Sequence, residues 1–195
     1  IALLFMTSCR DQPDWGKQVR DTLHEKVMAD AAWAMQQKPQ TIVDFPCQRS
    51  EGSINDYYSE ADYWWPDPED PDGPYIHRDG ETNPDIFSGH RQAMMRLSKI
   101  VGSLASAYLI TGNEDYVKHA FDHARAWFVD TDTRMNPDLK FSQAIKGVIK
   151  GRRSGIIDTI HLIEVAQGLH RMQDASVVDQ KALAAVKKWF VKYTG

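Results

Sequence analysis

The chain has 195 residues, of which 42% are hydrophobic and 26% are charged, and it contains 12 glycines and 9 prolines. This balance is typical of a globular protein and excludes collagen, a coiled coil and a wholly disordered chain. The chain has 23 Lys and Arg residues against 27 Asp and Glu residues, which gives a formal net charge of -4. Because no overall basic field results, we expect no nucleic-acid partner.

The first eight residues are apolar or small, and the chain turns polar immediately after Cys9. This order is typical of a secretory signal peptide that ends at a cysteine able to carry a lipid. An apolar N-terminal strand or helical turn is the alternative. We expect residues 1–9 to be a partial lipoprotein signal peptide, Cys9 to be the lipidated residue, and this anchor to be the only contact with a membrane. Residues 10–195 would then form the exported domain.

Apolar residues recur at helical spacing in five segments. The predicted helices run from about Asp14 to Gln37, from after Ser88 to Thr111, from after Asn113 to Phe128, from Ile156 to Met172, and from after Ser176 to Tyr193. Gly112 is a typical residue after a helix C-terminus, and Asn113 is a typical N-cap. No long run alternates with period two, so the sequence does not predict a sheet.

Short turns at Gly112–Asn113 and Gln173–Asp174 join neighbouring helices into two antiparallel hairpins. Repeated hairpins favour an all-α fold of the α/α solenoid or toroid type, with a helical bundle carrying one long insertion as the alternative. The last predicted helix has no further packing partner in the sequence. We therefore expect an incomplete toroid with exposed apolar helix faces, which would make the isolated chain prone to aggregate.

Two long segments, 39–87 and 131–155, lack a helical pattern. The first is rich in aromatic residues, which solvated linkers lack, so we expect it to pack on the helices. Trp64 and Trp65 stand beside a proline in a polar loop, where indoles can stack on sugar rings. Alternatively, they seal the underside of the loop.

Four cations, Lys146, Lys150, Arg152 and Arg153, lie close together in a loop that contains glycines. Guanidinium groups can bind a carboxylate through two parallel hydrogen bonds, and a helix N-terminus after Gly155 would add partial positive charge. The loop therefore suits an anionic ligand, while a solvated basic loop is the alternative.

Two possible metal motifs are incomplete. His119 and His123 share a helix face, but no third ligand accompanies them. In the stretch Asp67–Gly73, a proline interrupts the ligand spacing of a calcium loop, so we interpret it as a turn. We expect neither a metal nor a cofactor.

Several blocks of this sequence, in the right order, resemble the alginate lyase superfamily of polysaccharide lyases. The blocks are Tyr57–Pro68 (YYSEADYWWPDP), Asp72–Pro84 (DGPYIHRDGETNP), His90–Arg91, Arg134–Pro137 (RMNP), Gln143–Ile145 (QAI), Gly151–Arg152 and Gly155–Ile163 (GIIDTIHLI). Lys146 departs from the family, in which proline is expected at this place. The resemblance covers about residues 57–165.

The resemblance implies an α/α toroid that encloses a groove, in the periplasm or cell envelope of a Gram-negative bacterium. It also implies cleavage of a uronate-containing polysaccharide, of the alginate or glucuronan type, by β-elimination. Removal of the C5 proton places charge on the uronate carboxylate, so neutralising donors, a Tyr or His base and a Tyr acid are needed. In the family, an Asn-Asn-His block after the helix that corresponds to Val177–Tyr193 supplies the neutralising groups, with the Tyr and an Arg further on. This sequence has no such block, so we expect the catalytic residues to lie beyond position 195 and the chain itself to be inactive.

The substrate of such an enzyme is an anionic polysaccharide, and the chain offers candidates to bind it. They are Tyr58, Ser59, Trp64, Trp65, Arg78, Asn83, Gln143 and Arg152, with His90 as the candidate catalytic residue inside the chain. We expect the aromatic loop and the loop with Arg152 to fold together as one side of a groove. The acidic loop 44–85 would repel a polyuronate unless its carboxylates cap helices or pair with Arg49 and Arg78.

Two other functions stay open. One is a carbohydrate-binding lipoprotein without catalysis. The other is a glycoside hydrolase on a helical toroid, which would need two carboxylates on either side of the scissile bond.

Overall fold

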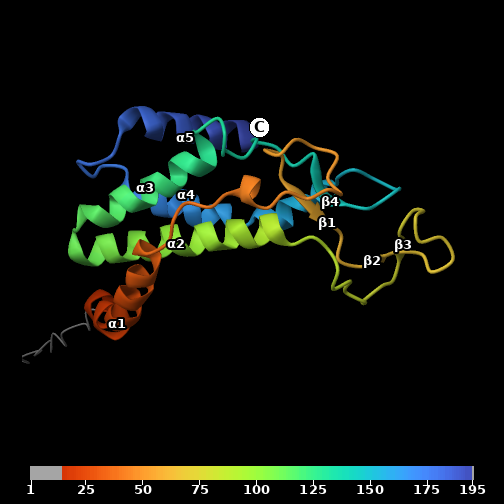
Figure 1. Cartoon of the computed structure of the whole chain (residues 1–195). Helices are drawn as coiled ribbons and strands as arrows, with labels where there is room; N and C mark the ends of the chain where they lie inside the picture. The colour runs from red at the N-terminus through yellow and green to blue at the C-terminus, as the bar shows by residue number, and fades with distance from the viewer. Residues whose placement is uncertain (1–14, 195) are drawn as a thin grey trace, which may run out of the picture.

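The computed structural model describes residues 15–194 and is mostly helical, which confirms the predicted all-α class (Figure 1). The α-helices of this part are α1 (Trp15–Met35), α2 (Gly89–Thr111), α3 (Glu114–Phe128), α4 (Leu162–Met172) and α5 (Gln180–Thr194). Two 3-10 helices, η1 (Ile42–Asp44) and η2 (Arg153–Thr159), lie between them. Within the described part, none of the helices is long and apolar enough to span a bilayer. Cys9, the predicted lipid anchor, lies outside the described residues.

Helix α2 is the centre of the helical core and packs against α1, α3 and α4 (Figure 1). Its buried apolar residues at helical spacing include Met94, Leu97, Ile100, Val101 and Leu104. Helices α3 and α5 meet through the rings of Phe128 and Trp189, whose centroids are 4.6 Å apart. Burial of each large apolar side chain contributes about 1.5–3 kcal/mol, so packing on α2 holds the helices together.

The hairpin between α2 and α3 forms as the sequence predicts. Gly112 has a φ of 70° and its N–H donates to the carbonyl of Tyr108, which ends α2. Asn113 then accepts a hydrogen bond from the Asp115 N–H through its side chain and caps α3. Glycine takes this left-handed conformation at little cost, and Asn at the cap satisfies a free helix N–H.

The last two helices begin later than predicted. The segment from Arg153 to Thr159 is a 3-10 helix, and α4 begins only at Leu162. For α5, predicted to begin after Ser176, the side chain of Asp179 accepts the N–H of Lys181 at 2.8 Å and caps the helix. The backbone N–H of Ser176 donates to Glu114 at the start of α3.

Helices α4 and α5 do not pack tightly on each other. They flank an apolar groove of about 380 Å³, lined among others by Leu169, Leu183, Val186, Phe190 and Val191. The N-terminal half of α1 also lacks cover, because Val19 and Leu23 of its predicted apolar stripe are exposed. Apolar helix faces are thus exposed in the described part of the chain.

Four short strands lie at the end of the helical core where α2 begins (Figure 1). Strand β1 (Tyr58–Glu60) pairs in parallel with β4 (Phe141–Ala144), and β2 (Trp64–Trp65) pairs antiparallel with β3 (Ile76–His77). The sequence did not predict them. Strands of two to four residues are too short to show the alternation on which such a prediction depends.

Candidate functional site

The pairing of β1 with β4 joins the aromatic loop to the loop that carries Arg152. Tyr58 lies opposite Phe141 and Glu60 lies opposite Ala144. The backbone N–H of Gln143 also donates to the Ser59 hydroxyl at 2.8 Å. The expectation that these two loops fold together is therefore confirmed.

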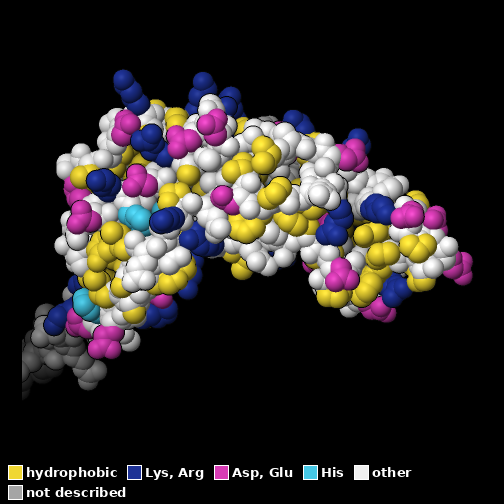
Figure 2. All heavy atoms as spheres, in the orientation of Figure 1, with side chains coloured by type: hydrophobic (Ala, Val, Ile, Leu, Met, Phe, Trp, Pro, Cys, Tyr) yellow, Lys and Arg dark blue, Asp and Glu magenta, His cyan; other side chains and the backbone are white. Residues whose placement is uncertain are grey.

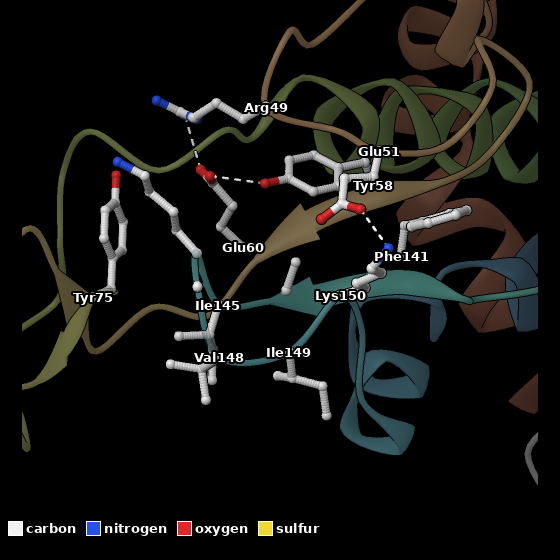
Figure 3. A pocket seen from close by; sticks show the side chains of 13 residues that line it. Arg49, Glu51, Tyr58, Glu60, Tyr75, Phe141, Ile145, Val148, Ile149 and Lys150 are labelled. Atoms are coloured by element: carbon white, nitrogen blue, oxygen red, sulfur yellow. Dashed lines mark hydrogen bonds and ion pairs between the residues drawn. The ribbon is translucent and has the colours of Figure 1, made fainter. Parts of the chain in front are cut away.

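One face of this small sheet borders a pocket of about 530 Å³ (Figure 3). Tyr58 and Glu60 face it from β1, because successive side chains of a strand point to opposite sides. The loop after β4 closes another side, and Arg49, Glu51 and Tyr75 complete the lining.

The Glu60 carboxylate is the polar centre of the pocket. It is 8% exposed and accepts hydrogen bonds from the Tyr58 hydroxyl at 2.9 Å and from Arg49 Nη2 at 2.8 Å (Figure 3). The backbone N–H of Phe87 adds a third bond at 2.6 Å. Burial raises the pKa of Tyr58, and the negative charge of Glu60 raises it further. Tyr58 therefore remains a protonated donor to Glu60 at neutral pH.

Two lysines border the same pocket. Lys150 pairs with Glu51, with Nζ and Oε2 2.5 Å apart. Lys146 has no carboxylate within ion-pair distance among residues 15–194, and its ammonium lies 5.7 Å from the centroid of the Tyr75 ring. Lys146 therefore offers an unneutralised charge beside an aromatic face at the pocket.

A buried hydrogen-bond network occupies the other face of the sheet. The Ser59 hydroxyl donates to the Asp158 carboxylate, which is 2% exposed. Gln143 donates through Nε2 to both oxygens of Asp158 at 3.1 Å and accepts from Arg152 Nη2 at 3.0 Å. Ser59, Gln143 and Arg152, three of the predicted binding residues, thus belong to one connected group.

The hairpin of β2 and β3 carries four of the other candidates. Trp64 and Trp65 are partly exposed, and the guanidinium of Arg78 lies 5.0 Å from the centroid of the Trp65 ring. Asn83 is buried, and its amide donates to the carbonyl of Trp64 at 2.9 Å. Asn83 therefore holds β2 in place, whereas the two indoles and Arg78 keep surface for a ligand.

None of these four candidates lines the pocket beside Glu60, to which the hairpin contributes Tyr75. Its lobe projects from the helical body, and the surface is hollowed beneath the body, between α1 and this lobe (Figure 2).

His90 is buried at the start of α2 and has no free ring nitrogen. Its Nδ1 accepts the N–H of Tyr58 at 2.9 Å, and its Nε2 faces the carbonyl of Phe45 at 3.0 Å, which fixes the neutral ring with the proton on Nε2. Burial lowers the pKa of His90 to about 4. In this structure His90 therefore fastens β1 to α2, and its geometry does not support the catalytic role considered for it.

The acidic character of loop 44–85 is compensated only in part. Arg49 pairs with Glu60, and Arg78 lies 3.9 Å from Glu81. Asp44 belongs to a capping box with Thr41 at η1. The other carboxylates of the loop, among them Asp62, Asp67, Asp70 and Asp79, pair with no Lys or Arg among the described residues, so the expected repulsion of a polyuronate is only partly offset. Among residues 15–194, no three His, Cys, Asp or Glu side chains gather as metal ligands would.

The sequence analysis named Arg49 only as a partner for the carboxylates of its loop, and it did not single out Glu60 or Asp158. Glu60 and Asp158 lie inside the blocks that carry the family resemblance, so the signal was present there. Arg49 lies outside every block, and only the folded chain brings it to Glu60.

Comparisons with known proteins find similarity to alginate lyases in both sequence and structure. The sequence model of the alginate lyase family matches residues 44–195. The crystal structure of an alginate lyase from Bacteroides ovatus matches with a TM-score of 0.79 and 32% sequence identity, over 91% of this chain and 50% of that one. The chain thus spans about half the length of the lyase that it matches. No curated protein matches the chain.

Proposed function

The chain belongs to the alginate lyase family, and we propose that it forms part of a polysaccharide lyase that cleaves an alginate- or glucuronan-type uronate polymer by β-elimination. The observation that carries this proposal is the pairing of β1 with β4. It places the cationic loop of Lys146 and Arg152 directly beside the aromatic loop. In this proposal the cations of the one loop bind uronate carboxylates and the indoles of the other bind sugar faces, with Lys146 at the pocket on Glu60 and Arg152, Trp64 and Trp65 outside its lining.

In β-elimination a base removes the proton from C5 of the uronate, a C4–C5 double bond forms, and the C4–O bond breaks as an acid protonates the leaving oxygen. Donors aimed at the carboxylate stabilise the charge that develops on it. We propose that Arg152, Lys146, Trp64, Trp65 and Arg78 bind and orient the polymer. The base and the acid would come from the half of the lyase fold that this chain does not span.

Ser59, Asn83 and His90 would then support the site without contacting the substrate. Each is buried and hydrogen-bonded to a neighbouring segment. Tyr58 is also buried, and it points to the pocket on Glu60. In this assignment these four residues fix the shape of the wall, while the partly exposed side chains contact the sugar.

The geometry does not favour a glycoside hydrolase. The buried carboxylates of residues 16–194 are Glu60 and Asp158. Glu60 points to the pocket on one face of the sheet, whereas Asp158 bonds Ser59 on the other face. These two carboxylates do not converge on one glycosidic bond, as hydrolysis by an acid and a base requires. Glu51 lines the pocket together with Glu60, but both are ion-paired, Glu51 with Lys150 and Glu60 with Arg49.

The proposal extends to location and architecture. We propose that the helical hairpins form part of an α/α toroid. The protein would be exported to the periplasm or cell envelope of a Gram-negative bacterium and anchored through Cys9. Labelling of cells with a tagged palmitate should mark the wild-type protein and not the Cys9→Ser variant. Equal labelling of both would contradict the anchor.

Activity is tested by incubating the full-length gene product with polymannuronate, polyguluronate and glucuronan, and with the same polymers after chemical reduction of their carboxylates. We expect the ultraviolet absorbance of an unsaturated product from at least one uronate polymer and from no reduced polymer. New reducing ends without this absorbance would indicate a hydrolase. Binding without any product would indicate a carbohydrate-binding protein, and either result would contradict the lyase.

A further inference from the structure

Asp158 is a buried carboxylate without a cation. Among residues 15–194, no Lys, Arg or His nitrogen lies within ion-pair distance of it. Its described partners are neutral, namely the Ser59 hydroxyl and the Gln143 amide. A buried charge is costly unless it is well hydrogen-bonded, so its position calls for an explanation beyond packing.

The side-chain amide of Gln143 links the Asp158 carboxylate to the Arg152 guanidinium through hydrogen bonds. The amide must place Nε2 toward the carboxylate and Oε1 toward the guanidinium, because the opposite orientation would set donor against donor and acceptor against acceptor. The backbone carbonyl oxygen of Gln143 also accepts from Arg152 Nε at 3.1 Å. Gln143 therefore binds the guanidinium at two points, while Asp158 fixes which way the amide faces.

The backbone of Gln143 is held in an unusual conformation. Its φ of 53° makes it the one non-glycine residue with positive φ among those described. Residues other than glycine adopt this region at a cost, and such strain concentrates at ligand sites. The bond from its N–H to Ser59 helps to hold it there.

The backbone around Arg152 is also fixed. The Arg152 N–H donates to the carbonyl of Ser142 at 2.9 Å. A Cβ on Gly151 would lie 2.1 Å from the carbonyl oxygen of Lys140, and one on Gly155 would lie 1.8 Å from the Ser142 hydroxyl. The loop thus fits closely against β4, and both ends of the Arg152 side chain are restrained.

We propose that Asp158 and Gln143 form a relay that positions Arg152 to bind the carboxylate of a uronate. A guanidinium has five N–H donors, and Gln143 uses two of them. The remaining N–H donors bind no carboxylate in the described structure, so the positive charge of the guanidinium stays available to a ligand. A direct Asp–Arg pair would instead neutralise the guanidinium and compete with the substrate.

The relay rests on the proposed function, because it assigns Arg152 a uronate ligand. Orienting residues behind a ligand-binding group affect affinity without touching the ligand, as the partners of metal-bound histidines do. A rigid, preorganised guanidinium loses less freedom when it binds a carboxylate. Asp158 and Gln143 are accordingly positioning residues, and Arg152 is the residue that touches the sugar.

The test is a double-mutant cycle read by calorimetric titration with mannuronate and glucuronate tetrasaccharides. Asp158→Asn keeps the shape but presents an NH₂ group to the Gln143 amide. We expect it to weaken binding about tenfold and to have no further effect in an Arg152→Gln background. Asp179→Asn, a carboxylate substitution at the cap of α5, should bind like the wild type. Equal losses from Asp158→Asn in both backgrounds would overturn the relay.

A second variant protects the test against misfolding. Gln143→Gly removes the amide but relieves the positive φ, so we expect a folded protein whose affinity for the uronate is also reduced about tenfold. The carboxyl-reduced tetrasaccharide should bind all variants alike, and a loss of its binding in parallel would mark a general structural defect and overturn the relay.

The NMR signal of the Arg152 Nε–H separates the relay from the proposed function. In the ligand-free protein this proton should exchange slowly, and Asp158→Asn should accelerate its exchange. If this holds but no uronate binds to the wild type, the relay exists without the proposed ligand, and both the uronate assignment and the proposed function fail. If the exchange is unchanged while uronate binds, only the relay fails.

Discussion

Replacement of His90 by Gln should make the stability of the protein less sensitive to acid. The buried ring is neutral, with Nδ1 accepting the N–H of Tyr58 and Nε2 donating to Phe45. A second proton on the ring would face the backbone N–H of Tyr58, donor against donor. Burial is the largest cause that lowers the pKa of His90 from 6.5 to about 4, and the hydrogen bonds to backbone carbonyls only partly oppose it.

The direction and size of the effect follow from proton binding. The unfolded chain binds a proton at this residue near pH 6.5, whereas the folded protein binds it only near pH 4. Because the unfolded state binds more protons between these values, the free energy of unfolding falls as the pH is lowered through this window. The contribution is fully present above about pH 6.5, and about 3 kcal/mol is lost by about pH 4.

His123 provides an internal comparison. Burial, followed by the charge of His119, lowers its pKa to about 4 as well. The wild type should therefore lose the contributions of two histidines in the same window, and each of the variants His90→Gln and His123→Gln should lose only one.

Urea unfolding between about pH 7 and pH 4.5 measures this dependence. Each substitution should reduce the slope of unfolding free energy against pH by about 1.4 kcal/mol per pH unit in the middle of the window. Carboxylates titrate equally in all three proteins, so the difference between slopes isolates the histidine. An unchanged slope in His90→Gln would refute the assignment of a neutral, buried ring.

Three further substitutions, one of them with a matched control, test packing. Tyr57→Phe removes a buried hydroxyl that makes no hydrogen bond of good geometry within residues 15–194, so the free energy of unfolding, measured by thermal unfolding, should stay unchanged or rise by up to about 1 kcal/mol. A clear loss of stability would show that the nearby Ser59 hydroxyl is a partner. Gly155→Ala should lower the free energy of unfolding by about 1–3 kcal/mol, because the added Cβ would clash with Ser142. Gly102→Ala in α2 is the control and should be tolerated, because its Cβ would meet only the flexible side chain of Glu164. Equal losses of stability in the two variants would contradict this. Ile157→Lys, at a side chain that is 66% exposed, should change stability by less than about 0.5 kcal/mol and reduce self-association in sedimentation, and a large destabilisation would show that the side chain is covered.

The helical core could be predicted because its signals are local. The amphipathic spacing identifies α2 and α3, and the glycine and N-cap residue Gly112–Asn113 identify the turn between them. The start of α4 could not be predicted, because Ile156, Ile157 and Ile160 have the spacing of a buried helix face but are exposed in this structure. The apolar pattern therefore predicted burial that the described residues do not provide.

The site was predictable only in part, for a different reason. Gln143 and Arg152 could be found from the blocks that resemble alginate lyases. The contacts that give them a role come from Ser59 and Asp158, which the chain brings together across about a hundred residues through strands too short to detect. Arg49 reaches Glu60 across only 11 residues, but through an irregular loop that has no periodic pattern. Hydrogen bonds between distant segments leave no periodic trace in the sequence.

The central claim is that the loops joined by β1 and β4 form a surface for acidic sugars. Titration of the isotope-labelled protein with a uronate tetrasaccharide, followed by NMR, tests it most directly. The account predicts shifts in the amides of residues 143–153 and in the indole N–H of Trp64 and Trp65, while the indoles of Trp127 and Trp189 in the core stay unchanged. Shifts confined to other surfaces, or equal shifts with the carboxyl-reduced sugar, would contradict it.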